Sequence, residues 1–187
     1  MLSSEVARID MRTAFKKRGM AMKGKQRMSV AIAIAICGAL SGTAHSQTTV
    51  KHIQSAGKPL ATAVWAGDTL YVSGQLADPV TPADATKGTP AAYGDTKAQA
   101  NSEFIKIQAI LKEQGLTMGD VVSMHVYMAG DPSKDGKLDF AGLQAAYTQY
   151  FGTADQPNKP TRAAMQVAAL AAPWALVEIE VIAVRSK

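Results

Sequence analysis

The stretch LVEIEVIAV at residues 176–184 alternates between two kinds of residue. Every second position from Val177 to Ala183 is apolar, whereas the positions between them include Glu178 and Glu180. A period of two predicts a β-strand that buries one face. Because an unpaired buried acid is unfavourable, either the face with the two glutamates reaches solvent or a partner, or one of the acids has a chemical role.

Further strands are predicted before this one. Two runs of β-forming residues, 62–66 and 69–73, flank the turn pair Gly67-Asp68 and predict a hairpin. The remaining apolar or β-branched segments predict strands over 121–128 and 161–168, and a leading strand or loop over 53–60.

Two segments show the helical period, with apolar residues three or four positions apart. The first helix is predicted over about 95–114, with Asp95 as its N-cap and Gly115 just after its end. The second begins after the N-cap Asp139 and ends before Gly152. The expected apolar faces consist of Ala100, Phe104, Ile107 and Leu111 in the first helix, and of Phe140, Leu143, Tyr147 and Phe151 in the second.

The order of these elements predicts an α+β two-layer domain, in which two helices cover one face of a mixed six-stranded sheet. Each predicted helix has a single apolar side, so the helices cover only one face of the sheet. The other face must be buried elsewhere, and the simplest partner is another copy of the chain.

The net charge of the 187-residue chain is +5, but it is unevenly distributed. Residues 1–46, the expected leader, hold eight basic and two acidic residues, which gives +6. Residues 47–187, the expected domain, hold ten Lys and two Arg against nine Asp and four Glu, which gives −1. A nearly neutral domain lacks the basic excess that binding to nucleic acid requires.

The leader has the pattern of a secretory signal peptide. Basic residues precede the apolar run Val30–Cys37, and small residues follow it up to Ser46. The run is short for a membrane span, and an amphipathic helix or a retained anchor is the alternative. Cleavage near Ser46 predicts a periplasmic or secreted domain without cysteine and without stable membrane association. Translation is expected to begin at Met22 or Met28, because residues 1–21 fit no part of a signal peptide.

The domain shows no motif for a metal or a nucleotide. His52 and His125 lie far apart without a neighbouring Cys, and each is expected to be an ordinary polar residue of a strand or loop. Neither a glycine-rich phosphate loop nor the nucleophile motif GxSxG occurs. The sequence therefore predicts no metal and no cofactor.

Arg162 is one of only two Arg residues in the expected domain. It follows Pro160 and Thr161 at the start of a predicted strand, where a rigid loop would place its side chain at the sheet edge. A guanidinium grips a carboxylate with two parallel hydrogen bonds, which Lys cannot do. Arg162 is therefore a candidate for binding a small carboxylate, and a structural ion pair with one of the two glutamates of the last strand is the alternative.

Three segments lie in order around the two predicted helices: Tyr71-Val-Ser-Gly-Gln75, Pro160-Thr-Arg162 and Val177-Glu-Ile-Glu-Val-Ile-Ala-Val-Arg185. This combination resembles the Rid (reactive intermediate deaminase, YjgF-like) family, and the resemblance covers about residues 50–185. It implies a chorismate-mutase-like fold and a homotrimer with three clefts at the subunit boundaries. It also implies hydrolysis of reactive 2-imino acids or enamines to 2-keto acids and ammonia, without a metal or cofactor.

The resemblance implies roles for four residues. Arg162 falls on the family's arginine for the substrate carboxylate. Glu178 is expected beside it in the cleft, where it matches the acid that positions or activates the attacking water. Ser73 and Gly74 match the wall of the substrate pocket.

Two positions of the expected pocket depart from the family pattern. Leu60 stands where studied deaminases carry Tyr, so a hydrogen-bonding phenol is lost, and Gln144 stands where they carry Asn. The loops 78–94 and 130–138 look longer than usual, which would reshape the mouth of the cleft.

Two functions are therefore expected as alternatives. One is an exported deaminase of 2-imino acids, and the other is a non-catalytic trimer that binds small carboxylates in the periplasm. The near-neutral domain argues against a nuclease.

Overall fold

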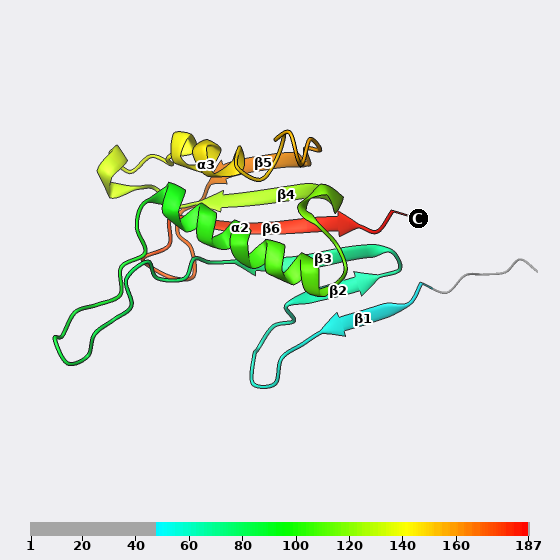
Figure 1. Cartoon of the computed structure of the whole chain (residues 1–187). Coiled ribbons are helices and arrows are strands. Elements are labelled where there is room, and N and C mark those ends of the chain that lie inside the picture. Colours follow the sequence, from blue (N-terminus) through cyan, green and yellow to red (C-terminus); the bar gives the residue numbers. More distant parts are fainter. Residues whose placement is uncertain (1–47, 187) are drawn as a thin grey trace, which may run out of the picture. The chain divides into compact units, whose positions relative to one another are not determined.

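The computed structural model describes residues 48–186, and the expected leader lies outside these described residues. They form six strands and two helices (Figure 1). The elements are β1 (Val50–Ile53), β2 (Ala63–Ala66), β3 (Thr69–Gln75), α2 (Thr96–Glu113), β4 (Val121–Met128), α3 (Phe140–Tyr147), β5 (Thr161–Gln166) and β6 (Val177–Val184). Two short 3-10 turns, Met118–Asp120 and Pro132–Lys134, precede β4 and α3 respectively.

The strands form a single sheet in the order β1-β2-β3-β6-β4-β5. β4 and β5 run parallel, and all other neighbours run antiparallel, so the sheet is mixed as predicted. The predicted hairpin is β2 and β3, and Gly67 in its turn adopts a φ of 62°, which favours glycine. The first strand lies earlier than expected, at Val50–Ile53, whereas residues 54–61 form a loop.

The first helix is confirmed almost to the residue, whereas the second is shorter than predicted. The side chain of Asp95 caps α2, and that of Asp139 caps α3. α3 ends at Tyr147 because the side chains of Thr148 and Gln149 hydrogen-bond to carbonyl oxygens of its last turn. Two turns follow, and they still bury Phe151 against the core.

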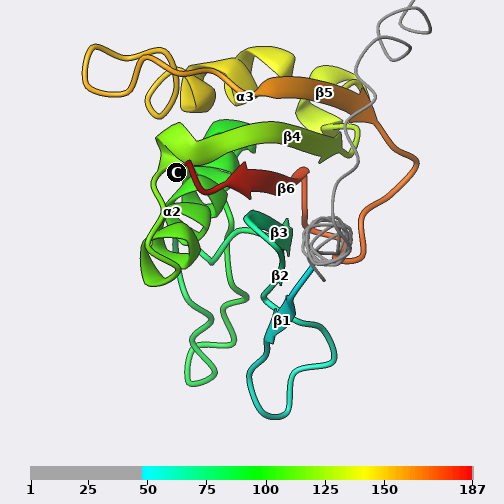
Figure 2. The ribbon, with the colours of Figure 1, turned by 90° about the vertical axis from the view of Figure 1, so that its right-hand side faces the viewer.

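Both helices lie on one face of the sheet (Figures 1 and 2), as predicted. The core forms where Phe104 and Ile107 of α2 meet the apolar positions of β6, such as Ile179. The intervening positions of β6, including Glu178 and Glu180, are half-buried on the opposite face. This open face has no covering element among residues 48–186.

The loop after β3 is a projecting arm, residues 79–93, held by two isolated β-bridges, Thr81 to Ala92 and Asp84 to Thr89 (Figure 1). At its base Tyr93 stacks on Trp174, with ring centres 3.5 Å apart.

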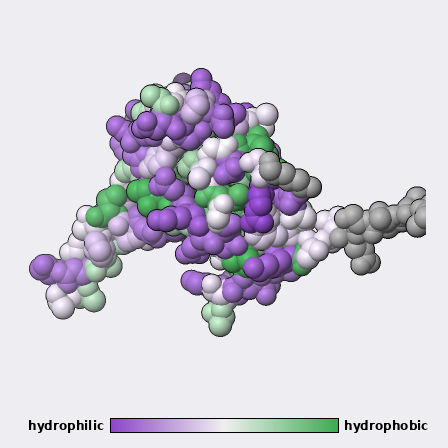
Figure 3. Space-filling view, turned by 45° about the vertical axis from the view of Figure 1, so that its right-hand side comes forward, coloured by the Kyte–Doolittle hydropathy of each residue, from purple (hydrophilic) through white to green (hydrophobic). Residues whose placement is uncertain are grey.

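The surface face drawn in Figure 3 mixes hydrophilic and hydrophobic residues. No helix within residues 48–186 combines the length and apolar character needed to cross a membrane.

Candidate functional site

Arg162 is held rigidly at the edge of the sheet. Its Nη2 donates a hydrogen bond of 2.9 Å to Oε1 of Gln144. Its guanidinium carbon lies 4.3 Å from the ring centre of Tyr147 and 5.5 Å from that of Phe140. The prediction that Phe140 belongs to the buried face of α3 is wrong. Its side chain is 49% exposed and lies beside the arginine. Nη1 is buried and has no hydrogen-bond partner among the described residues, so its two N–H donors are unsatisfied.

The strand register decides which way Arg162 points. Arg162 pairs with Met124 on β4, and Met124 is buried on the helix-covered face. Side chains at paired positions share a face, so Arg162 points toward α3. Glu178 pairs with Tyr127 on the open face. The structure therefore does not place Arg162 and Glu178 side by side within one chain, and among residues 48–186 Arg162 forms no ion pair with either glutamate of β6.

Ser73, Gly74 and Leu60 come together at the end of β3. They line a hollow of about 250 Å³, in which Leu60 is 73% exposed. The Ser73 hydroxyl donates a hydrogen bond of 2.7 Å to the carbonyl oxygen of Ala61, which fixes the neighbouring loop. Glu178 lies directly against Gly74, so closely that a Cβ on residue 74 would overlap its carboxylate. Four of the six predicted site residues thus adjoin one another.

The environment of Glu178 suits an acid or base. Burial raises the pKa of the Glu178 carboxyl above its ordinary value, and the charge of Glu180 raises this pKa further. Glu180 accepts a hydrogen bond of 3.3 Å from the Tyr127 hydroxyl, and its Oε1 lies 2.9 Å from Nδ1 of His125. The charge of Glu180 also raises the pKa of Tyr127. Glu178 therefore takes up and releases a proton closer to neutral pH than an ordinary glutamate does.

Glu103 on α2 is a further carboxyl near the site. It is fully buried, and neither carboxyl oxygen has a hydrogen-bond partner among the described residues. Burial raises the pKa of Glu103 to about 10, with a contribution from the charge of Glu178. The sequence analysis did not identify Glu103, although the sequence contained a signal for it. Glu103 is an acid directly before Phe104, and it interrupts the apolar face of the helix. The sequence analysis also did not identify Tyr127 as a neighbour of Glu180. The alternation of residues along a strand does not show which residues of the next strand lie opposite.

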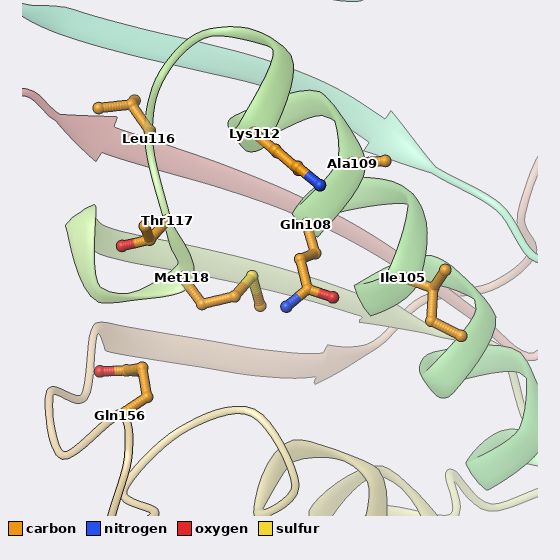
Figure 4. A pocket seen from close by; sticks show the side chains of 8 residues that line it. All are labelled: Ile105, Gln108, Ala109, Lys112, Leu116, Thr117, Met118 and Gln156. Atoms are coloured by element: carbon orange, nitrogen blue, oxygen red, sulfur yellow. The ribbon is translucent and has the colours of Figure 1, made fainter.

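A larger hollow of about 700 Å³ lies away from these residues, between α2 and the segment before β4 (Figure 4). Apolar side chains such as Ile105 and Met118 line much of it, and Lys112 is its only titratable group. It contains none of the predicted site residues. Within residues 48–186, no three His, Cys, Asp or Glu side chains come together as a metal would require.

Comparisons with known proteins agree with the fold and with a family resemblance over about residues 50–185. A family model described as Endoribonuclease L-PSP matches residues 50–185. A RutC family protein of Haemophilus influenzae is 39% identical over 127 residues, which are 68% of this chain and 87% of that protein. A RutC family protein of Pyrococcus horikoshii is 35% identical over 125 residues, or 67% of this chain and 86% of that protein.

Solved structures show the same architecture. Escherichia coli TdcF with bound serine has a TM-score of 0.56 at 33% identity, over 73% of this chain and 99% of that chain. A YjgF family protein of Neisseria meningitidis, 21% identical, has a TM-score of 0.56 over 75% of this chain and 98% of that chain and shows the fold alone. The match over residues 50–185 and the RutC relatives establish that the chain belongs to the YjgF/RutC/Rid family.

Proposed function

We propose that this protein hydrolyses reactive 2-imino acids to 2-keto acids and ammonia, at sites shared between the subunits of a homotrimer. The observation that carries the proposal is the guanidinium of Arg162, oriented by Gln144 and Tyr147, with Nη1 unsatisfied. A small carboxylate supplies the acceptors that this guanidinium lacks.

The shared site follows from the two faces of the sheet. Arg162 and Gln144 lie on the helix-covered side of the sheet. Glu178 lies on the open side, and Gly74 lies against it. A second copy packed against the open face would bury it and bring Arg162 of one subunit to Glu178 of the next. Trimers are typical of the family.

The reaction would proceed without oxidation or reduction. Arg162 binds the substrate carboxylate, and Glu178 takes a proton from water as the water oxygen bonds to the imine carbon. The substrate reacts as the protonated iminium, so the C=N electron pair moves to a nitrogen that already carries two hydrogens and becomes an uncharged amine. Glu178 then returns its proton to the amine nitrogen of the tetrahedral intermediate. The C–N bond breaks, ammonia leaves, and loss of the hydroxyl proton gives the keto group.

Relatives support this chemistry. TdcF of Escherichia coli, 37% identical over 120 residues, carries a provisional description as a reactive intermediate deaminase. Its structure contains bound serine, whose carboxylate and amino groups sit on one carbon as in the proposed substrates.

The proposed location is the periplasm or the exterior, because residues 1–46 have the pattern of a signal peptide. Amino-terminal sequencing of the protein recovered from cell fractions tests this. A chain that begins near residue 47 in the periplasmic or secreted fraction is expected, whereas an uncleaved chain confined to the cytosol would contradict it.

A non-catalytic binder of small carboxylates is the second candidate. It is favoured by Leu60, which is 73% exposed in the hollow and offers no hydroxyl to a substrate. A nuclease, which the family description mentions, receives no support from the net charge of −1 on residues 47–187.

The test is release of ammonia and keto acid from imino acids generated in the assay by an amino-acid oxidase. Arg162→Ala should reduce kcat/KM by about a hundredfold or more, and Arg162→Lys, which keeps the charge but loses the fork, by about tenfold. Arg185→Ala is the matched control, since Arg185 stacks on Trp65 instead. Equal rates for wild type and Arg162→Ala would overturn the proposal, and saturable binding of 2-keto acids without turnover would favour the binder.

A further inference from the structure

Glu103 faces the site from behind the sheet. One turn earlier on α2, Gln99 hydrogen-bonds to backbone groups immediately before β6. One turn later, Lys106 donates a hydrogen bond to a backbone carbonyl immediately after β3. The side chain between them is therefore directed at the ends of β3 and β6, where Gly74 and Glu178 lie.

Packing alone does not explain an acid at this position. Of the buried side chains that neighbour it on α2, Ala100, Phe104 and Ile107 are apolar, and Gln99 is polar. An ionised carboxylate without partners is strongly unfavourable among them, so Glu103 keeps its proton. An apolar side chain would fill the same space without leaving polar atoms unpaired.

We propose that Glu103 is a positioning residue that acts through Glu178: it is an uncharged carboxylic acid behind the sheet that favours the ionised form of Glu178. A polar O–H group stabilises a nearby charge better than hydrocarbon does. This inference rests on the proposed role of Glu178 as the base.

The environments of the two carboxyls separate their tasks. Glu103 retains its proton, so Glu178 is the one that exchanges a proton with water. The charge of Glu178 in turn raises the pKa of Glu103, so the two groups are coupled. The other titratable groups around the pair are Glu180 on β6, Tyr127 and His125 on β4, and Lys106 on α2.

The experiment compares Glu103→Leu with Glu103→Gln in the full domain. The readouts are the titration of the Glu178 carboxyl by ¹³C NMR, assigned with Glu178→Gln, and the acidic limb of kcat/KM against pH. Glu103→Leu should move both to higher pH by about half a unit or more, because it replaces a polar group by hydrocarbon. Glu103→Gln should leave both near the wild-type values, because it remains polar and uncharged.

An unchanged titration in Glu103→Leu, or an equal shift in both variants, would overturn the inference. The NMR titration needs no turnover, so it separates the two proposals. If wild type shows no deaminase activity but Glu103→Leu shifts the titration of Glu178, the reaction fails and the coupling stands.

Discussion

A methyl group added at Gly74 would overlap the carboxylate of Glu178. Gly74→Ala should therefore displace Glu178 and lower kcat/KM by about tenfold or more, because a misplaced base loses its alignment with water. Gly119→Ala is the matched control, since its added Cβ would meet nothing nearer than 3.4 Å. Equal kcat/KM values for the two variants would show that the contact between residues 74 and 178 does not matter for turnover.

Glu103 also makes stability depend on pH. Its pKa is about 10 in the folded protein against 4.5 as the ordinary value, so the folded state keeps a proton that the unfolded state releases. Stability from this group therefore falls as pH rises above 4.5. Relative to Glu103→Gln, the wild-type free energy of unfolding should fall by about 1.4 kcal/mol per pH unit between pH 6 and 8. Urea unfolding measures this, and the same change in the free energy of unfolding for both proteins between pH 6 and 8 would refute the prediction.

α2 carries Glu103, and its first turn depends on Asp95. The Asp95 carboxylate accepts a hydrogen bond of 2.8 Å from the backbone N–H of Ala98. Asp95→Ala should lower the free energy of unfolding by about 1 kcal/mol, as loss of an N-cap does, whereas Asp95→Asn should retain most of it. Urea unfolding at neutral pH measures both, and equal losses in the two variants would mean that capping is not the cause.

The elements that the sequence predicted best have strong local signals. The hairpin turn at Gly67, the cap at Asp95 and the alternation of β6 are each encoded within a few residues. The end of α3 was misplaced because side-chain bonds from Thr148 compete with the helix, and apolar spacing does not report such competition. β1 was misplaced because a short edge strand has little burial pattern.

The candidate site was predictable as a set of residues but not as an arrangement. The resemblance implied that Arg162, Gln144, Ser73 and Gly74 belong to one pocket; the structure joins Arg162 to Gln144 by a hydrogen bond and groups Ser73 with Gly74 in a hollow. Which face of the sheet Arg162 occupies depends on its pairing with β4, and strand register is a long-range property.

Within residues 48–186, one face of the sheet has no covering element. Tyr71 and Met165 are 49% and 43% exposed on that face, together with the half-buried glutamates of β6. In the proposed homotrimer, another subunit would remove the apolar surface of this face from water and would also supply the missing half of the proposed site. The hypothesis therefore predicts that deaminase activity depends on assembly of the trimer.

Refolding Arg162→Ala together with Glu178→Gln tests the shared site most directly. Each variant alone should retain about one hundredth of the wild-type activity or less, because every site lacks one essential group. In trimers assembled at random from equal amounts of the two variants, about one quarter of the sites would receive both an intact Arg162 and an intact Glu178 from adjacent subunits. The predicted result is therefore recovery of up to about one quarter of wild-type deaminase activity. No recovery, in mixtures that mass spectrometry shows to contain both subunits, would contradict a site built from two chains.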